Sequence, residues 1–457
     1  MSLLYAIALN CVFVTSQIMA EENGVVSYAG FQVWKIKPSS EGDQQFILDI
    51  IDSYELELWS KRRMARDPMD VKVPPRSQTK LKSKLAERKI SYVVVISDLQ
   101  TAIDNQKTKV NRIISNWKPA YDMDWISYHT LNDIYAFLTY LNTTYPKLVQ
   151  LTNIGSSYEK RPLYVLRISN SSSAGTRPAI WIDGGIHARE WISPAVATYI
   201  IQQLVEVPAN AKLLSNVDWY IMPVVNPDGY EYTHTKDRMW RKTRSVSSTS
   251  SCRGADPNRN FGYKWGGLGA STNPCDDTYR GTTAFSEPET LATSNFIMGK
   301  SSQIKLYLTL HSYGQFGLLP YGYDVVYPSD YNDVLALVNN AASRFVNYRY
   351  TVGNTAALLY AASGGSADWA KSIGIKYSYT FELPDRGTNA FTLPASEILP
   401  VCQDFFPALD VFATKVATCC GAVNSTTTVK PLTTARQLLD DQQPNLDPRP
   451  QLRNVLT

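Results

Sequence analysis

The first part of the chain, from about residue 27 to residue 98, alternates short strand-like runs with amphipathic helical patterns. Apolar side chains gather in short runs in the strand-like segments and recur at intervals of three and four in the helical ones. The predicted elements are strands at 31–36, 56–59, 69–73 and 91–97, the last of them buried, and helices around 47–54 and over 77–89. The order βαββαβ is that of a ferredoxin-like domain.

Longer apolar strands alternate with helical patterns from about residue 128 to residue 418. The strand candidates are 165–169, 179–183, 218–225, 304–312 and 375–383, and helical patterns follow Ser193, Glu287, Asn332 and Pro394. Apolar strands separated by helices predict an α/β domain whose mixed, mostly parallel sheet is covered by helices on both faces. Ligands bind such sheets outside the strand ends, where we expect the loop after 179–183 and His311.

The two ends of the chain differ in composition from the parts between them. Residues 1–20 hold a short apolar run followed by Ala20 at a position suited to cleavage, which predicts a secretory signal peptide. That run is too short for a membrane span and no other segment is as long, so we expect a secreted, extracellular protein. Residues 421–457 are polar and rich in Thr, Pro, Gln and Asp, which predicts a disordered tail.

The net charge says little about which classes of molecule the protein binds. The formal net charge is +4 over 457 residues, which gives no argument for nucleic-acid binding. Basic residues gather between Lys61 and Lys89, where a solvated helical face and loop is favoured over a binding patch. Basic residues are also spaced through residues 104–124. This composition favours neither of two interpretations, a plain interdomain linker or a segment that a trypsin-like protease cuts to activate the protein.

Export permits disulfides, and the cysteine count after signal removal is odd. At least one thiol is therefore expected to be unpaired or to pair between molecules. The cysteines that remain are Cys252, Cys275, Cys402, Cys419 and Cys420, and glycosylation sequons begin at Asn142, Asn170 and Asn424.

The loop DGGIHAREWIS, residues 183–193, places three ionisable side chains, His187, Arg189 and Glu190, between an apolar strand and an apolar helix. Burying such groups is costly unless they are paired. One explanation is a metal ion held by His187, Glu190 and His311, since histidine and carboxylate side chains bind zinc. Surface salt bridging is the other, and the spacing H-x-x-E alone does not decide between them.

The rest of the chain resembles the pancreatic-type zinc metallocarboxypeptidases, the A/B subfamily, in their secreted zymogen form, and within it the A type most. The resemblance spans about residues 30–418. It rests on seven collinear segments: YHTLNDIYAFL, GIHAREWIS, NPDGYEYTHTKDRMWRKTRS, DPNRNF, LHSYGQ, LYAASGGSADWA and IKYSYTFEL. It implies the zinc carboxypeptidase fold, one Zn²⁺ per chain, and a ferredoxin-like propeptide that caps the active-site cleft until it is cleaved.

Carried over residue by residue, the resemblance implies a complete catalytic set. It makes the histidine and glutamate of the loop, together with His311, the zinc ligands, and it makes Asp256 the residue that orients the first histidine. Glu382 is implied as the base that acts on water, and its place at the end of an apolar strand should raise its pKa. Arg241 would stabilise the carbonyl oxyanion. The implied substrate-binding residues are Asn258, Arg259, Tyr360 and, with less weight, Arg189.

The implied reaction removes one C-terminal residue at a time from peptides and proteins. Preference in the family depends on one pocket position after SGGS, which is Ala367 here. A-type members have a bulky aliphatic residue there, and B-type members have an aspartate that pairs with Lys or Arg. An uncharged alanine predicts apolar or aromatic C-terminal residues. A B-type enzyme is the alternative, because a shift of one residue would bring Asp368 into the pocket.

The resemblance also implies a Cys252–Cys275 disulfide, and Cys402 with Cys419 or Cys420 is a candidate second bridge. The domain prediction is 1–20 signal peptide, 21–118 activation propeptide with basic linker, 119–420 catalytic domain and 421–457 tail. Activation cleavage is expected between about Lys107 and Lys118.

We expect a monomer whose partners are peptide substrates and a trypsin-like activating protease, with no nucleic acid or membrane. The alternative is a non-catalytic relative that binds peptides without cleaving them. The complete set of predicted zinc ligands, catalytic base and substrate-binding residues argues against it.

Overall fold

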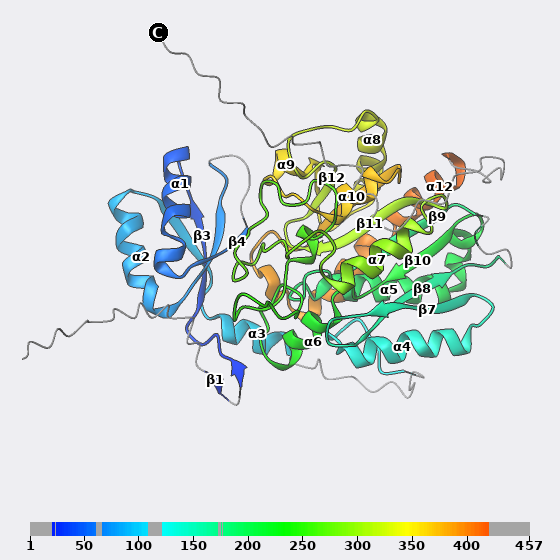
Figure 1. Ribbon diagram of the computed structural model, residues 1–457, viewed down its shortest axis with the longest axis horizontal. Helices are drawn as coiled ribbons and strands as arrows, with labels where there is room; N and C mark the ends of the chain where they lie inside the picture. The colour runs from blue at the N-terminus through cyan, green and yellow to red at the C-terminus, as the bar shows by residue number, and fades with distance from the viewer. Residues whose placement is uncertain are drawn as a thin grey trace, which may run out of the picture.

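The computed structural model describes residues 21–22, 24–60, 66–107, 121–171, 175 and 177–419. The signal peptide, most of the activation segment and the polar tail, all predicted above, lie outside these residues. Two units lie side by side, a small N-terminal one in blue and a larger one in cyan to orange (Figure 1). The helices of the described part include none that is both long and apolar enough to cross a bilayer.

The small unit has the predicted βαββαβ order. Its elements are β3 (Gln32–Lys37), α1 (Glu41–Ile50), β4 (Glu57–Ser60), β5 (Met69–Val73), α2 (Pro75–Glu87) and β6 (Ser91–Ile96). The strands pair antiparallel in the order β4-β5-β3-β6 around a core that includes Trp34, Val71 and Leu81. Ser40 begins α1 by accepting a hydrogen bond from the backbone N–H of Asp43 at 3.1 Å.

The expectation that residues 91–97 form a buried strand is wrong. The strand β6 exists, but it lies at the edge of its sheet and pairs only with β3. Val93 on it is 52% exposed. A run of consecutive valines is typical of a buried strand, but an edge strand of a small sheet has too few neighbours to cover both of its faces.

Short elements complete the small unit and join it to the large one. They are β1 (Glu21–Glu22), β2 (Val25–Val26), a 3-10 helix (Asp52–Tyr54) and α3 (Leu99–Lys107). The helix α3 runs from the small unit onto the large one, where the Gln106 side chain donates to the backbone oxygens of Phe391 at 3.3 Å and Leu393 at 3.0 Å.

The large unit is built on an eight-stranded mixed sheet in the order β13-β12-β14-β11-β9-β10-β8-β7. The pairings β12–β13, β14–β11, β11–β9 and β9–β10 are parallel, and the other three are antiparallel. The strands are β7 (Val149–Ser156), β8 (Pro162–Ile168), β9 (Ala179–Asp183), β10 (Asp218–Met222), β11 (Ile304–Ser312), β12 (Phe316–Leu319), β13 (Thr351–Asn354) and β14 (Tyr377–Leu383). Of these, β7, β12 and β13 have no counterpart in the sequence prediction.

Helices cover both faces of this sheet, as predicted. Alternate residues of β9 show this directly, because Ile180 and Ile182 belong to one apolar cluster and Ala179 and Trp181 to another. The helices are α4 (Leu131–Thr144), α5 (Ile192–Glu206), α6 (Pro227–Thr235), α7 (Pro288–Met298), α8 (Tyr331–Ala342), α9 (Thr355–Leu358), α10 (Ser366–Ser372), α11 (Ile398–Phe405) and α12 (Ala408–Cys419). Short 3-10 helices span Pro208–Leu214, Pro257–Arg259, Ala390–Thr392 and Ala395–Glu397.

The parallel register brings the ends of three central strands together. Asp183 at the end of β9 pairs with Thr309 of β11, and His311 pairs with Glu382 of β14. Because parallel strands end at the same edge, the loop after β9 and the last residues of β11 and β14 meet there. The candidate site lies at this edge.

Candidate active site

Three buried side chains from two strand ends, His187, Glu190 and His311, meet at this edge. Glu190 Oε1 lies 2.7 Å from His187 Nδ1, and its Oε2 lies 3.1 Å from His311 Nδ1. The backbone N–H of Ser312 also donates to Oε2 at 3.1 Å. One potential ligand atom from each of the three side chains lies within 4.8 Å of the others.

The arrangement of these atoms fits a metal ion better than it fits salt bridges alone. The Nδ1 atoms of His187 and His311 are only 3.1 Å apart. If both imidazoles were neutral, their lone pairs would face each other there, beside a carboxylate, which is unfavourable. A shared cation would accept electron pairs from both nitrogens and from the carboxylate at once. Two histidines and one glutamate are also a zinc donor set that leaves a coordination position open. These three residues could therefore hold a zinc ion.

Asp256 contacts His187 on the ring nitrogen that faces away from the other two candidate ligands. Its Oδ1 lies 3.0 Å from His187 Nε2, and its Oδ2 accepts from Arg241 Nη2 at 2.8 Å. Burial opposes ionisation of this carboxyl group, but the charges of Arg241 and Arg259 and the hydrogen bond from His187 outweigh it and keep the pKa of Asp256 well below its usual range. A charged Asp256 fixes the proton of His187 on Nε2, which leaves Nδ1 free for the metal.

A cavity of about 130 Å³ adjoins this cluster. Arg241, Asn258, Arg259, Tyr360 and Glu382 all lie on its wall, so the structure brings together the residues that the sequence had suggested separately. Burial raises the pKa of the Glu382 carboxyl to about 7. This direction is the one expected for a carboxyl at the end of an apolar strand.

Asn258 and Arg259 are rigidly held and still keep hydrogen-bond donors free. Asn258 Oδ1 accepts from the backbone N–H of Ser366 at 2.9 Å, and Arg259 donates to the backbone oxygens of Gly269 at 2.8 Å and Asn258 at 2.9 Å. Among the described residues, Asn258 Nδ2 and Arg259 Nη2 have no acceptor. Gly364 lies close behind them with φ +76°, and a Cβ there would come within 2.3 Å of the Arg259 backbone oxygen. Only glycine therefore suits this position of SGGS.

The carboxylates that line the cavity are Asp70, Glu190 and Glu382. Another part of the wall is mainly apolar and consists of Phe316, Leu318, Thr355, Leu359, Ala362 and Thr380. Asp368 is turned away from it, because both carboxylate oxygens accept from the backbone N–H of Gly322 at 2.8 Å. Ala367 is partly buried against the neighbouring apolar cluster and is not on this wall, so its role in specificity stays a prediction.

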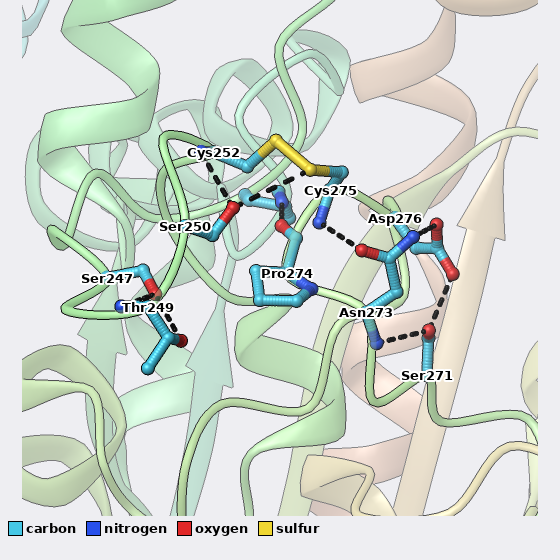
Figure 2. The surroundings of a disulfide bond; sticks show 10 residues. Ser247, Thr249, Ser250, Cys252, Ser271, Asn273, Pro274, Cys275 and Asp276 are labelled. Atoms are coloured by element: carbon cyan, nitrogen blue, oxygen red, sulfur yellow. Dashed lines mark hydrogen bonds between the residues drawn. A yellow bond between two sulfur atoms is a disulfide. The ribbon is translucent and has the colours of Figure 1, made fainter. Parts of the chain in front are cut away.

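A disulfide closes the segment that carries the predicted substrate-binding residues. Cys252 and Cys275 are joined, and the intervening chain contains Asp256, Asn258 and Arg259. Figure 2 shows the polar side chains that support the bridge, including Ser250, whose Oγ accepts from the Cys252 N–H at 3.1 Å. The expected second bridge is wrong for Cys402, which is a free thiol buried in the main core.

Replacing both Cys252 and Cys275 by serine should weaken substrate binding as well as stability. Opening this loop is expected to cost about 2–4 kcal/mol of unfolding free energy. It should also raise KM more than it lowers kcat, because the loop positions Asn258 and Arg259 rather than the metal ligands. Calorimetry and steady-state kinetics check the two parts separately. A lowered Tm with an unchanged KM would show that the bridge only stabilises the fold.

The small unit covers the cavity. Trp59, Ser60 and Asp70 contribute to the cavity wall, and the Tyr313 hydroxyl donates to Asp70 Oδ2 at 3.0 Å. Arg189 donates to Glu57 of the small unit at 2.6 Å. The sequence did not single out Tyr313 or Glu57. The position of Tyr313 in LHSYGQ, beside a ligand, was the only signal for it.

Arg189 is shared between the two units. Besides Glu57, it pairs with Asp277 of the large unit at 3.1 Å and lies over the Phe391 ring at 4.4 Å from its centroid. Asp277 would still neutralise it after the small unit leaves. Arg189 is 3% exposed while the small unit is in place, so a substrate could reach it only after that departure.

The Glu57→Gln variant of the full-length protein should be less tightly inhibited before activation. It removes a buried charge partner of Arg189, and breaking such a pair across an interface is costly. We expect about a tenfold rise in activity towards a small peptide before trypsin treatment. The matched control is Asp49→Asn, which removes the same charge at an exposed position on α1. Equal activity of both variants would mean that the Arg189 contact does not hold the small unit in place.

The comparisons with known proteins agree with this geometry. The family described as zinc carboxypeptidase matches residues 134–408, and the family described as carboxypeptidase activation peptide matches residues 34–106. Carboxypeptidase A2 of Mus musculus is 39% identical over 387 residues, covering 83% of this chain and 92% of its own. Carboxypeptidase B of Astacus astacus is 44% identical over 297 residues, covering 64% of this chain and 97% of its own.

Solved structures support the same assignment for the whole described part. The crystal structure of thrombin activatable fibrinolysis inhibitor superposes with a TM-score of 0.78 at 37% identity, covering 84% of this chain and 98% of that one. The crystal structure of carboxypeptidase A from Helicoverpa armigera has the same TM-score of 0.78 at 29% identity. The chain therefore belongs to the zinc carboxypeptidase family, as a metallocarboxypeptidase that carries the activation peptide of the A/B-type zymogens.

Proposed function

We propose that the protein is secreted as an inactive precursor and that, after trypsin-like cleavage between about Lys107 and Lys118, it releases apolar or aromatic residues from peptide C-termini. One observation carries this proposal: the three metal ligands, Glu382 and the free donors of Asn258 and Arg259 all face one cavity. That cavity ends in a mainly apolar wall.

The clamp residues account for a reaction restricted to chain ends. A C-terminal carboxylate can accept hydrogen bonds from Asn258 Nδ2 and Arg259 Nη2, which have no acceptor among the described residues. A guanidinium group suits a carboxylate because it offers planar, paired donors. Tyr360 is 37% exposed at the rim, where it can close over the terminal residue. A peptide without a free C-terminus would leave these donors unpaired.

The side chains of the cavity can carry the proton transfers and stabilise charge. His187, Glu190 and His311 would hold the zinc ion, which would supply Lewis acidity that makes water a better nucleophile and polarises a carbonyl group. Glu382 accepts a proton from the attacking water and donates it to the departing amine nitrogen. Arg241 lines the same cavity and would stabilise the oxyanion that develops at the scissile carbonyl.

The apolar wall supports an A-type preference over a B-type one. Lysine or arginine at the substrate C-terminus would need a carboxylate deep in the cavity, and Asp368 is committed to the backbone of Gly322. Without such a partner, a buried cation is strongly disfavoured, whereas a Phe or Leu side chain gains from burial.

The test uses the full-length protein after brief trypsin treatment and removal of the trypsin. Peptides ending in Phe, Leu, Ala, Lys or Glu are incubated with it, and loss of the last residue is followed by mass spectrometry. Release of Phe and Leu that depends on prior cleavage is the expected result. Release of Lys instead would contradict the A-type assignment, and equal activity before cleavage would contradict the precursor assignment.

A further inference from the structure

A second, larger cavity of about 1450 Å³ lies beside the catalytic one, between the two units. Tyr360 and Trp59 line both cavities, so the second begins where the first opens. It extends past the disulfide loop to Trp240 and Arg244 of the large unit. Its opposite wall is residues 51–52 and 55–60 of the small unit, so departure of the activation peptide would open it to solvent.

Arg244 on this wall is buried, and no polar group of the described residues pairs with it. It is 8% exposed, and among the described residues it makes no hydrogen bond and no ion pair. Its guanidinium carbon lies 3.5 Å from the Tyr232 ring centroid and 4.4 Å from that of Trp240. The rings hold the cation by its faces and leave the N–H groups at its edge for an acceptor.

Two further cations of the large unit line the same cavity. Lys242 is 3% exposed, and its Nζ donates to the Pro274 backbone oxygen at 2.6 Å, but no carboxylate of the described chain pairs with it. Figure 2 shows Pro274 in the disulfide loop. Arg253 is exposed at the cavity, and its side chain has no partner in the described part either. Burial lowers the pKa of both Lys242 and Arg244, which is the direction expected for cations without a carboxylate.

The acidic residues of the large unit that face this cavity are engaged elsewhere. Asp276 is held by side chains of its own loop (Figure 2), and Asp277 pairs with Arg189. Asp237 accepts from the backbone N–H of Met239 at 2.9 Å and, while the small unit is in place, from the Tyr28 hydroxyl at 2.7 Å. None of these carboxylates forms an ion pair with Arg244 in the described part of the chain. A buried arginine without a partner is costly, and an anionic ligand would offset that cost.

We propose that Arg244, with Lys242 and Arg253 beside it, forms a second anion subsite, which binds the carboxylate of an acidic side chain in the peptide substrate upstream of the scissile bond. This inference rests on the proposed function, in which the C-terminal carboxylate occupies the Asn258–Arg259 clamp. The preceding residues of such a peptide leave the catalytic cavity past Tyr360, towards Arg244. A carboxylate in the guanidinium plane accepts two hydrogen bonds there.

The test compares peptides that end in Phe and carry one Glu at successive positions between the third and the seventh residue from the C-terminus, each with a Gln counterpart. The activated protein is assayed at low salt, and the readout is the ratio of kcat/KM for the Glu peptide to that for the Gln peptide. We expect a ratio of about ten at one or two positions. In Arg244→Gln the ratio should fall to about one, and Arg244→Lys should keep part of it.

A matched control separates a built site from general charge. Lys147→Gln removes one positive charge at an exposed position outside both cavities and should keep the wild-type ratio. Sodium sulfate should lower the ratio more than sodium chloride at equal ionic strength, because a free oxyanion competes for the same donors. A ratio that is unchanged in Arg244→Gln, or equally reduced in Lys147→Gln, would overturn the subsite.

A binding experiment keeps this result independent of turnover. Fluorescently labelled Glu and Gln peptides are titrated with activated Glu382→Gln protein, and their Kd values are compared by anisotropy. A tighter Glu peptide, with the difference lost when Arg244→Gln is added, supports the subsite even if no residue is released from any peptide. Equal Kd values for the two peptides would refute it, whereas absence of Phe release alone contradicts only the proposed function.

Discussion

Replacing Glu382 by glutamine is expected to lower kcat by about 10³-fold while the zinc content stays near one per chain. Glutamine keeps the size of the side chain but cannot accept the proton of the attacking water. Glu382 is not among the three ligand residues, so metal binding should survive. Stopped assays on activated protein and metal analysis of the same sample give both values.

The matched control for this variant is Glu231→Gln, on α6 and outside the cavity, which removes an equal charge. It should retain wild-type kcat. A kcat for Glu382→Gln within tenfold of wild type would show that another group takes the proton.

The pH profile gives a second signature of Glu382. Burial raises the pKa of its carboxyl to about 7, and the added charge of a zinc ion would lower that value towards the ordinary one of about 4.3. A base must be deprotonated to act, so kcat/KM should fall as pH decreases through the pKa of Glu382, between these two limits. The residual activity of Glu382→Gln should lack this acidic limb.

Replacing His311 by alanine should abolish zinc binding and reduce activity to on the order of 10⁻⁴ of wild type, because the Lewis acid is lost. His311 supplies one of three donors, and its Nδ1 is 3.1 Å from both Glu190 Oε2 and His187 Nδ1. Two remaining donors hold zinc far more weakly. Metal analysis after dialysis and a chelator competition assay measure the loss without relying on turnover.

The control is His129→Asn, because His129 bonds to Asp124 away from the cavity. It should bind zinc normally. A chelator should likewise inactivate the wild-type protein, and added zinc should restore it. Full zinc occupancy in His311→Ala would mean that the three-residue cluster is not the metal site.

The sequence was sufficient for the parts of the fold that depend on local pattern. The βαββαβ order and the main apolar strands follow from periodicity, because burial on one or both faces of an element leaves a regular trace in the chain. Strands β12 and β13 were missed, since each has only four residues and too few positions to show a period. The edge position of β6 was also missed, because its neighbours are set by the order of strands in the sheet.

The candidate site also separates what the sequence predicts from what only the tertiary structure determines. The short loop around His187 and Glu190 could be recognised from its residues, and the resemblance to a family supplied the remaining candidates. The tertiary structure alone decided that Glu190 faces His311 from 121 residues away and that Asp368 turns towards Gly322. It also decided that Arg244 is buried with no polar partner among the described residues. Pairings between distant residues depend on how strands align and loops close, and a single sequence carries no local trace of that alignment.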